Sequence, residues 1–388
     1  MASSIRLKGR QVLKSISSSL DLRKFPKKRE KDASAATVIK DVARSTTRES
    51  LRVILTSILM KGDEDLYLEN DAASSLYINL LDLPLEENDH PANNDSSCFF
   101  SPMPSDRLKS FPFDKSDPAT ERFLDGFDSW DESRETLTGF RAQRNPESLI
   151  SELNWLFSQC RRISPKGDKT YLHQEANWKH MALSPEIFHD DLFGMVDRAG
   201  QLHSKGKFGR LFDITDGYCA ARWDIRISEP HIIVMIEHEY VADEKISRAE
   251  VSTILAAMIT QLGHGHLEEH CIPPVMLVSF MGSLKGRILQ AHVTDSGLVI
   301  KKSKLYDFDK QVDFERSITL FTRHMASDRI GDTRQLTMFD LENKTVPILH
   351  SAATDKSIRA VADSENNIHE SIEPYDRGLW ELMQSVYL

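Results

Sequence analysis

The sequence predicts a mixed α/β fold for the central part of the chain, and three observations carry this expectation. Residues 232–240 are rich in Ile and Val, as in a buried strand. Residues 247–262 place a wide apolar stripe at helical spacing. Three further segments have the pattern of strands, namely 275–280, 287–293 and 298–302.

The first half of this domain is expected to contain helices followed by a meander. Asn145-Pro146-Glu147 opens a helix, since proline is well tolerated at the first helical position, and four apolar residues continue it: Leu149, Leu153, Leu156 and Phe157. A second helix is predicted at 173–183 and a third after Pro185. Strands at 211–214, 220–227 and 232–240 then form a three-stranded meander.

The second half begins with a crossover helix and returns to the sheet. The helix at 247–262 connects the meander to the later strands. Thr294-Asp295-Ser296-Gly297 predicts a hairpin turn between the last two strands. A helix at 314–325 closes the domain.

The chain divides by composition into three parts. Residues 1–145 are expected to be a mostly disordered arm, with a helix near 37–60; residues 146–330 form the folded domain, and 331–388 a polar tail. The arm is first basic and then acidic. Residues 1–50 hold 13 Lys and Arg against five Asp and Glu, whereas residues 61–135 hold six against 19 and are rich in proline.

A basic cluster lies within the first part of the arm. It could contact nucleic-acid phosphates or an import receptor, or it could be a solvated tail, and its residues are Arg23, Lys24, Lys27, Lys28 and Arg29. The first twenty residues contain Arg, Lys and Ser but no acid, which is also compatible with a mitochondrial presequence. A nuclear location is slightly preferred.

Composition and missing motifs exclude several classes of protein. The four cysteines have no C-x-x-C spacing, so we expect neither a disulfide framework nor a cysteine zinc site, and a reduced intracellular protein is the default. No apolar stretch approaches the roughly 20 residues of a membrane helix, so no membrane span is expected. The sequence contains no nucleophile elbow, phosphate-binding P-loop or dinucleotide fingerprint.

Three acids are expected to meet at one end of the meander. Asp224 is predicted on one strand and Glu237 and Glu239 near the end of the next. Alternate residues of a strand point to the same side, and neighbouring strands lie about 4.8 Å apart. Carboxylate oxygens suit Mg²⁺ or Mn²⁺, which can activate water for phosphodiester cleavage. The alternative is that these acids lie on an exposed strand end.

The same residues resemble a nuclease signature. Asp224, a spacer and Glu237-His238-Glu239 resemble the signature of the PD-(D/E)XK nucleases. Gln174-Glu175-Ala176-Asn177-Trp178, followed by His180 and Ser184-Pro185, is similar to the opening helix of the nuclease-like members found in filamentous fungi. The resemblance covers about residues 170–305. It implies a restriction-endonuclease-like core of one helix, a three-stranded meander, a crossover helix and further strands.

The resemblance also implies a role for each matching residue. Glu175 would be the helix acid, Asp224 and Glu237 the metal ligands, and Gln261 the glutamine often present on the crossover helix, where it would approach nucleic acid. Mg²⁺ or Mn²⁺ would be the cofactor and DNA the substrate. Glu239 occupies the position of the signature lysine.

Two positions depart from the signature. Trp223 stands where the signature has proline, and Glu239 replaces the lysine that would stabilise charge on the phosphate. Lys245 or Arg248, just downstream, could supply the missing cation. Two functions therefore stay open: a metal-dependent phosphodiesterase of weak or lost activity, and a non-catalytic binding or scaffold protein. Oligomeric state and substrate specificity are not predicted.

A second motif suggests zinc. His266 to His270 reads H-x-x-E-H, in which His266 and His270 would bind Zn²⁺ and Glu269 would activate water in a metalloprotease. That chemistry requires a continuous helix. Gly263 and Gly265 before the motif and Pro273-Pro274 after it instead indicate a loop that leads into a strand, which is the preferred interpretation.

Overall fold

The structure is a computed structural model of the 388-residue chain. It describes residues 35–59, 66–85, 98–128, 145–181, 212–221 and 227–344. For residues 35, 126–128, 181, 212–221, 227–228, 239 and 311 it describes only the backbone and its pairing. The chain divides into two units, Met1–Leu341 and Glu342–Leu388, and the fold below is that of the first.

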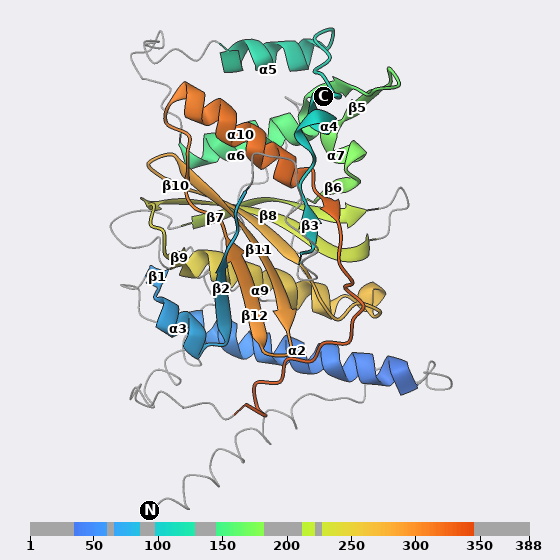
Figure 1. The fold of residues 1–388 in the computed structure, drawn as a ribbon, viewed down its shortest axis with the longest axis vertical. Helices are drawn as coiled ribbons and strands as arrows, with labels where there is room; N and C mark the ends of the chain where they lie inside the picture. The colour runs from blue at the N-terminus through green and yellow to red at the C-terminus, as the bar shows by residue number, and fades with distance from the viewer. Residues whose placement is uncertain are drawn as a thin grey trace, which may run out of the picture. The chain divides into compact units, whose positions relative to one another are not determined.

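A mixed sheet of eight strands forms the centre of this unit (Figure 1). Seven strands follow one another across it: β2 (Ile78–Asp82), β12 (Gly297–Lys302), β11 (Lys285–Thr294), β10 (Val275–Gly282), β8 (Ile227–Val241), β7 (Phe212–Ala221) and β6 (Trp178–Met181). The eighth, β13 (Tyr306–Asp307), pairs with β11. Only the β8–β10 and β12–β2 pairs of this sheet are parallel. The predicted mixed α/β class is therefore confirmed.

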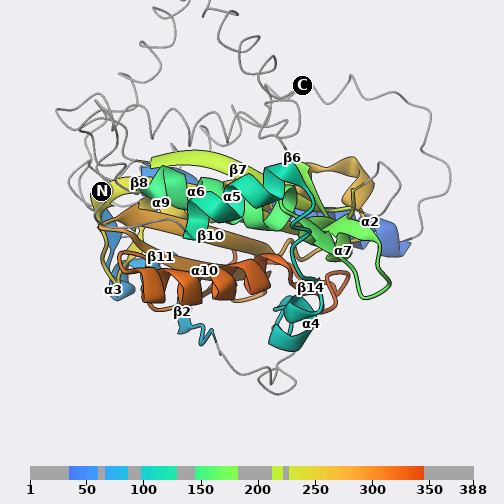
Figure 2. The same ribbon diagram turned by 90° about the horizontal axis from the view of Figure 1, so that it is seen from above.

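Helices cover both faces of the sheet (Figure 1). On one side lie α6 (Pro146–Asn154), continued as a π-helical turn at Trp155–Gln159, and α10 (Gln311–Met325); Figure 2 looks onto this side. On the other side lies α9 (Arg248–Gly263), and α2 (Ala35–Leu59) packs on its outer surface. Almost every residue of α9 is buried, because both the sheet and α2 cover it.

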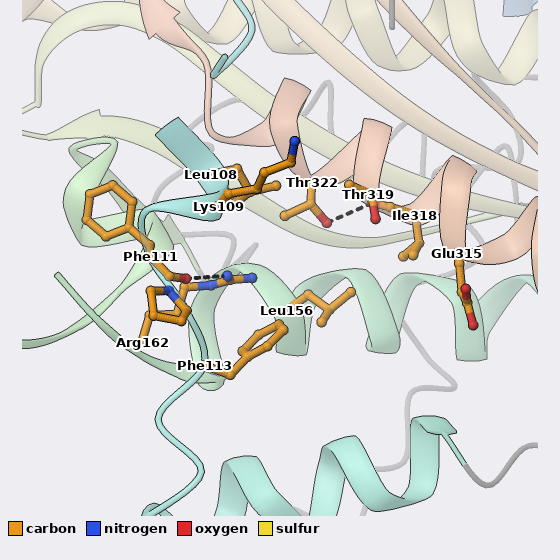
Figure 3. A pocket seen from close by; sticks show the side chains of 11 residues that line it. Leu108, Lys109, Phe111, Phe113, Leu156, Arg162, Glu315, Ile318, Thr319 and Thr322 are labelled. Carbon is orange, nitrogen blue, oxygen red and sulfur yellow. Dashed lines mark hydrogen bonds between the residues drawn. The ribbon is translucent and has the colours of Figure 1, made fainter. Parts of the chain in front are cut away.

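Short elements complete the unit. Three two-stranded pairs lie outside the main sheet: β1 (Tyr67–Leu68) with β9 (Ile246–Ser247), β3 (Phe100–Ser101) with β14 (Asp328–Arg329), and β4 (Arg161–Ile163) with β5 (Lys169–Tyr171). The short helices are α3 (Asn70–Ser75), α4 (Ser105–Lys109), α5 (Pro118–Asp128), α7 (Leu172–Glu175) and the 3₁₀ turn η3 (Gly265–Leu267). A pocket opens between α4, α10 and the end of α6 (Figure 3).

Several predicted elements are present. The helices expected near 37–60, at 146–157, at 247–262 and at 314–325 correspond to α2, α6, α9 and α10. The strands expected at 275–280, 287–293 and 298–302 are β10, β11 and β12. Thr294 pairs with Gly297 across the predicted turn. Gly297 is required there, because its φ is 144° and a Cβ would lie 2.2 Å from the Tyr77 carbonyl oxygen.

The segment 173–183 differs from the prediction. Instead of one helix, the chain forms the short helix α7, a turn at Ala176-Asn177 and strand β6. Asn177 has φ 55°, a left-handed conformation that ends a helix and that asparagine tolerates. The strands expected at 211–214 and 220–227 are one strand, β7, up to Ala221. Residues 222–226 and the helix expected after Pro185 lie outside the described residues.

The boundaries of the domain also differ from those expected. Residues 61–145 were predicted to be mostly irregular, yet β2 forms the edge of the central sheet in parallel with β12. The predicted tail contributes as well, since the Phe339 amide donates to Thr47 Oγ1 and its ring is buried. Residues 1–34, 129–144 and 345–388 lie outside the described residues. Among the described helices, none is both long and apolar enough to cross a bilayer.

The packing of α2 on α9 leads to a test of stability. Leu55 is fully buried in α2, so Leu55→Ala should lower the free energy of unfolding by about 2–5 kcal/mol. Val53 on the same helix is 46% exposed, and Val53→Ala should change it by less than about 0.5 kcal/mol. Urea unfolding of the full chain measures both. Equal effects of the two variants would show that α2 is not part of the core.

Candidate functional site

Strand pairing sets which acids of the meander can meet. In the antiparallel β7–β8 pair, Asp213 lies opposite Glu237. Asp224, the predicted partner of Glu237, lies outside the described residues. The residues that flank its segment, Ala221 and Ile227, pair with each other about ten residues from Glu237, roughly 33 Å along an extended strand. The acid that the register brings to Glu237 is therefore Asp213, which was not predicted.

Glu237 lies on the face of the sheet that α6 and α10 cover. Its neighbour His238 points to the opposite face, because His238 Nε2 is 2.9 Å from Ser279 Oγ in the buried layer beside α9. Successive side chains of a strand alternate in direction, which directs Glu237 toward α6 and α10. Phe280, the parallel partner of Glu237, accordingly packs on Phe321 of α10. Glu237 is half-buried there.

Glu175, the expected helix acid, does not lie on the long helix that precedes the meander. Glu175 lies on α7, a helix of only four residues, and Trp178 begins β6, where its indole donates to the Ser327 carbonyl. The longer helix that precedes the meander and packs on β8 is α6. It carries Glu152, one of whose carboxylate oxygens is buried. The Asn145 cap predicted this helix from the sequence, but nothing in the spacing selected Glu152.

The expected cations are held elsewhere. Lys245 Nζ is 2.6 Å from Glu69 Oε1, and this hydrogen bond raises the pKa of Lys245. Arg248 Nη2 donates to the Ile58 carbonyl at 2.7 Å. Gln261 is buried in α9, and its side-chain oxygen has no hydrogen-bond partner among the described residues. The basic cluster at residues 23–29 lies outside the part of the chain that the structure describes.

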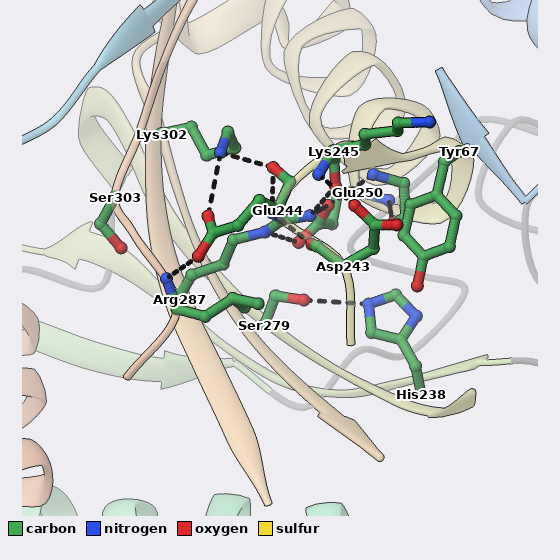
Figure 4. Close-up of polar contacts among 12 residues, drawn as sticks. Tyr67, His238, Asp243, Glu244, Lys245, Glu250, Ser279, Arg287, Lys302 and Ser303 are labelled. Carbon is green, nitrogen blue, oxygen red and sulfur yellow. Dashed lines mark hydrogen bonds and ion pairs between the residues drawn. The ribbon is translucent and has the colours of Figure 1, made fainter. Parts of the chain in front are cut away.

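A buried ion pair holds the segment that follows β8 (Figure 4). The Arg287 guanidinium donates to both carboxylate oxygens of Glu250, at 2.7 and 2.5 Å, and both side chains are fully buried. Arg287 also donates to the carbonyls of residues 243–245. Burial alone would raise the pKa of Glu250, but the attraction of Arg287 outweighs burial and holds that pKa at about 2.

Glu250 also starts the helix α9. The Ser247 side chain accepts a hydrogen bond from the Glu250 amide, and the Glu250 carboxylate accepts one from the Ser247 amide. This reciprocal capping box satisfies two donors at the helix start. Tyr67 packs edge-to-face on Tyr240 beside it, so the α9 side of β8 is closed. The other side of the strand, which carries the half-buried Glu237, is the one that α6 covers.

The H-x-x-E-H segment forms a loop. Only Gly265–Leu267 is helical, as a 3₁₀ turn, and the Arg44 side chain of α2 donates to the carbonyls of Leu262, Leu267 and His270. His270 Nδ1 lies 2.6 Å from Thr333 Oγ1, and Lys40 pairs with Glu269. The preferred loop interpretation is confirmed, and the continuous helix of a zinc metalloprotease is absent from these described residues.

Three histidines are buried without a charge. Burial lowers the pKa of His231 and of His238 to about 4 and that of His324 to about 3. His231 Nε2 faces the Ile330 carbonyl at 3.3 Å. Neither ring nitrogen of His324 has a hydrogen-bond partner among the described residues. All three histidines are therefore neutral in the folded chain at pH 7.

No group of three or more metal-ligating side chains occurs among the described residues, which do not include the side chains of Asp213 and Glu239. Comparison with known proteins identifies no relative. No family model matches the chain, and neither a curated protein nor a solved structure matches it. The register that sets Asp213 opposite Glu237 is thus the basis for a functional proposal.

The buried ion pair predicts strong energetic coupling. Arg287→Met should cost about 3–5 kcal/mol, because it leaves the Glu250 carboxylate buried without its cation. The double variant Arg287→Met/Glu250→Leu should be destabilised by about 2–3 kcal/mol less than the sum of the two single variants, because it buries no unpaired charge. Lys245→Met, which breaks an exposed ion pair, is the matched control and should leave the urea midpoint nearly unchanged. Additive single changes in urea unfolding would contradict this coupling.

His324 predicts a loss of stability in acid. The unfolded chain binds a proton on His324 below pH 6.5, whereas the folded chain does so only near pH 3, so stability falls as the pH falls through this window. Between pH 7.5 and 5.0 this histidine should remove about 2 kcal/mol. Urea unfolding of His324→Leu at both pH values should show a correspondingly smaller loss. An unchanged pH dependence would mean that His324 can accept a proton without unfolding.

Proposed function

We propose that the chain is a restriction-endonuclease-like protein in which Asp213 and Glu237 bind a divalent metal ion beside a phosphodiester of DNA. The single observation that carries the proposal is the register of the meander, which sets these two acids opposite each other on adjacent strands. Carboxylates at matching heights of neighbouring strands can share one cation.

The order of the elements supports this fold assignment. Helix α6 precedes a meander of three consecutive antiparallel strands, β6, β7 and β8. The helix α9 then crosses over to β10, which runs parallel to β8. One helix, a three-stranded meander, a crossover helix and a further strand is the core that the sequence resemblance implies.

The donor set suits Mg²⁺ or Mn²⁺. Both ions prefer carboxylate oxygen over nitrogen or sulfur, and the candidate ligands Asp213 and Glu237 are carboxylates. A bound ion would neutralise charge on the phosphate and lower the pKa of a water molecule.

Glu239 favours a second function, a non-catalytic binding protein that retains the same fold. It adds a negative charge where the nuclease signature has lysine. Lys245, the nearest substitute in sequence, is already paired with Glu69. Without a cation at this position, charge on the reacting phosphate is less well stabilised, and cleavage is expected to be slow.

Metal binding tests the proposal independently of activity. Calorimetric titration of the full chain with Mn²⁺ should show a site whose affinity falls at least about tenfold in Asp213→Asn and in Glu237→Gln. Asp224→Asn is the matched control, because it removes an identical charge from the part of the chain that links β7 to β8. A loss of binding in Asp224→Asn with none in Asp213→Asn would favour the predicted pair instead.

Cleavage of plasmid DNA separates the two functions. For an active enzyme, Mg²⁺-dependent cleavage should be present in the wild type and abolished in Asp213→Asn. For a binding protein, Mn²⁺ should bind without cleavage, and Glu239→Lys should raise activity from none by restoring the cation. Absence of metal binding to the wild type would remove the metal site from both functions.

A further inference from the structure

The pocket between α4, α10 and the end of α6 is a second candidate site, unrelated to the meander acids (Figure 3). Its volume is about 410 Å³, within the range of roughly 300–1,000 Å³ typical of small-molecule sites. The wall is mostly apolar, and the residues used below are Leu108, Phe111, Phe113, Leu156, Ile318 and Arg162.

Arg162 brings a charge into this apolar wall. The residue is 5% exposed, and its guanidinium carbon lies 3.9 Å from the centre of the Phe113 ring. Nη1 donates to the Phe111 carbonyl at 2.8 Å, whereas buried Nε has no hydrogen-bond partner among the described residues. In Figure 3 the guanidinium points from the strand toward Leu156, across the pocket.

Two other buried arginines, Arg287 and Arg44, have more hydrogen-bond acceptors than Arg162. Arg287 has the Glu250 carboxylate and three carbonyls. Arg44 has the carbonyls of the loop that follows α9. Arg162 donates to one carbonyl and stacks on one aromatic ring, and no described carboxylate forms an ion pair with it. Burying a cation without an anion is energetically costly. An anion bound in the pocket would therefore offset the unfavourable free energy of burying Arg162.

We propose that this pocket binds a small amphipathic carboxylate, with its carboxylate on Arg162 and its apolar body between Leu156, Leu108 and Ile318. Nη1 already donates to the Phe111 carbonyl and Nε is buried, so Nη2 is the nitrogen left to donate a charge-assisted hydrogen bond to a carboxylate. Glu315 and Lys109 lie at the rim. The negative charge of Glu315 disfavours a carboxylate at its end of the pocket and thereby directs the ligand's charged group toward Arg162.

Octanoate and octan-1-ol test this assignment, since they share an apolar chain and differ in charge. In calorimetric titrations of the full chain at pH 7.5, octanoate should bind at least tenfold more tightly than octan-1-ol. Arg162→Met keeps the length of the side chain and removes its charge. It should weaken octanoate at least tenfold and leave octan-1-ol unchanged. Equal binding of the two ligands, or octanoate binding unaffected by Arg162→Met, would overturn the proposal.

A pair of tryptophan variants tests the pocket itself without touching Arg162. Thr319 is an exposed lining residue of α10, so Thr319→Trp should fill the pocket and abolish binding of both ligands while the protein stays folded. Val312 is 78% exposed on the same helix and does not line the pocket, so Val312→Trp should change neither affinity. Octanoate binding that persists in Thr319→Trp, or no octanoate binding to the wild type, would refute the site. Because neither ligand involves Asp213 or Glu237, the result is independent of the metal proposal.

Discussion

The Arg287–Glu250 ion pair is the interaction on which the rest of the described unit depends. Arg287 comes from β11, Glu250 starts α9, and the carbonyls that Arg287 binds belong to the link between β8 and α9. One side chain of β11 thus joins the link after β8 to the start of α9. A parallel pair of strands needs such a crossover, so the position of β10 beside β8 depends on where α9 begins. Breaking the pair would release the helix start and the strand order together.

Local sequence patterns were sufficient to predict the helices and strands whose own residues have a clear apolar spacing. The apolar residues of α9 and the strands β10 to β12 were predicted within a few residues, because a buried helix and buried strands need many apolar side chains in sequence. The strand β6 was missed, since its helix-like pattern is interrupted by a left-handed Asn177 that only the backbone reveals. The edge strand β2 was missed because its stability comes from pairing with β12, more than 200 residues later.

The candidate site shows the same division between local and non-local information. Sequence spacing placed Glu237 near the end of its strand, where it lies. Its partner depended on where β7 begins and ends, which pairing with β8 determines, including a shift of register between Ile214 and Asp216. Spacing alone therefore could not choose between Asp213 and Asp224. For the H-x-x-E-H motif, by contrast, Gly263 and Pro273-Pro274 were local evidence for a loop, and the loop is present.

The charged side chains on the two faces of the sheet are in different surroundings, and this difference distinguishes structural charges from candidate functional ones. Beside α9, Glu250 and Arg287 satisfy each other, so that face can be closed and dry without an unpaired charge. On the side of α6 and α10, the half-buried Glu237 and the poorly partnered Arg162 have opposite signs and stand in separate places. A protein that needed these charges only for folding would gain stability by replacing them with apolar residues. A cation bound to the acids and an anion bound to Arg162, as proposed above, would balance both charges.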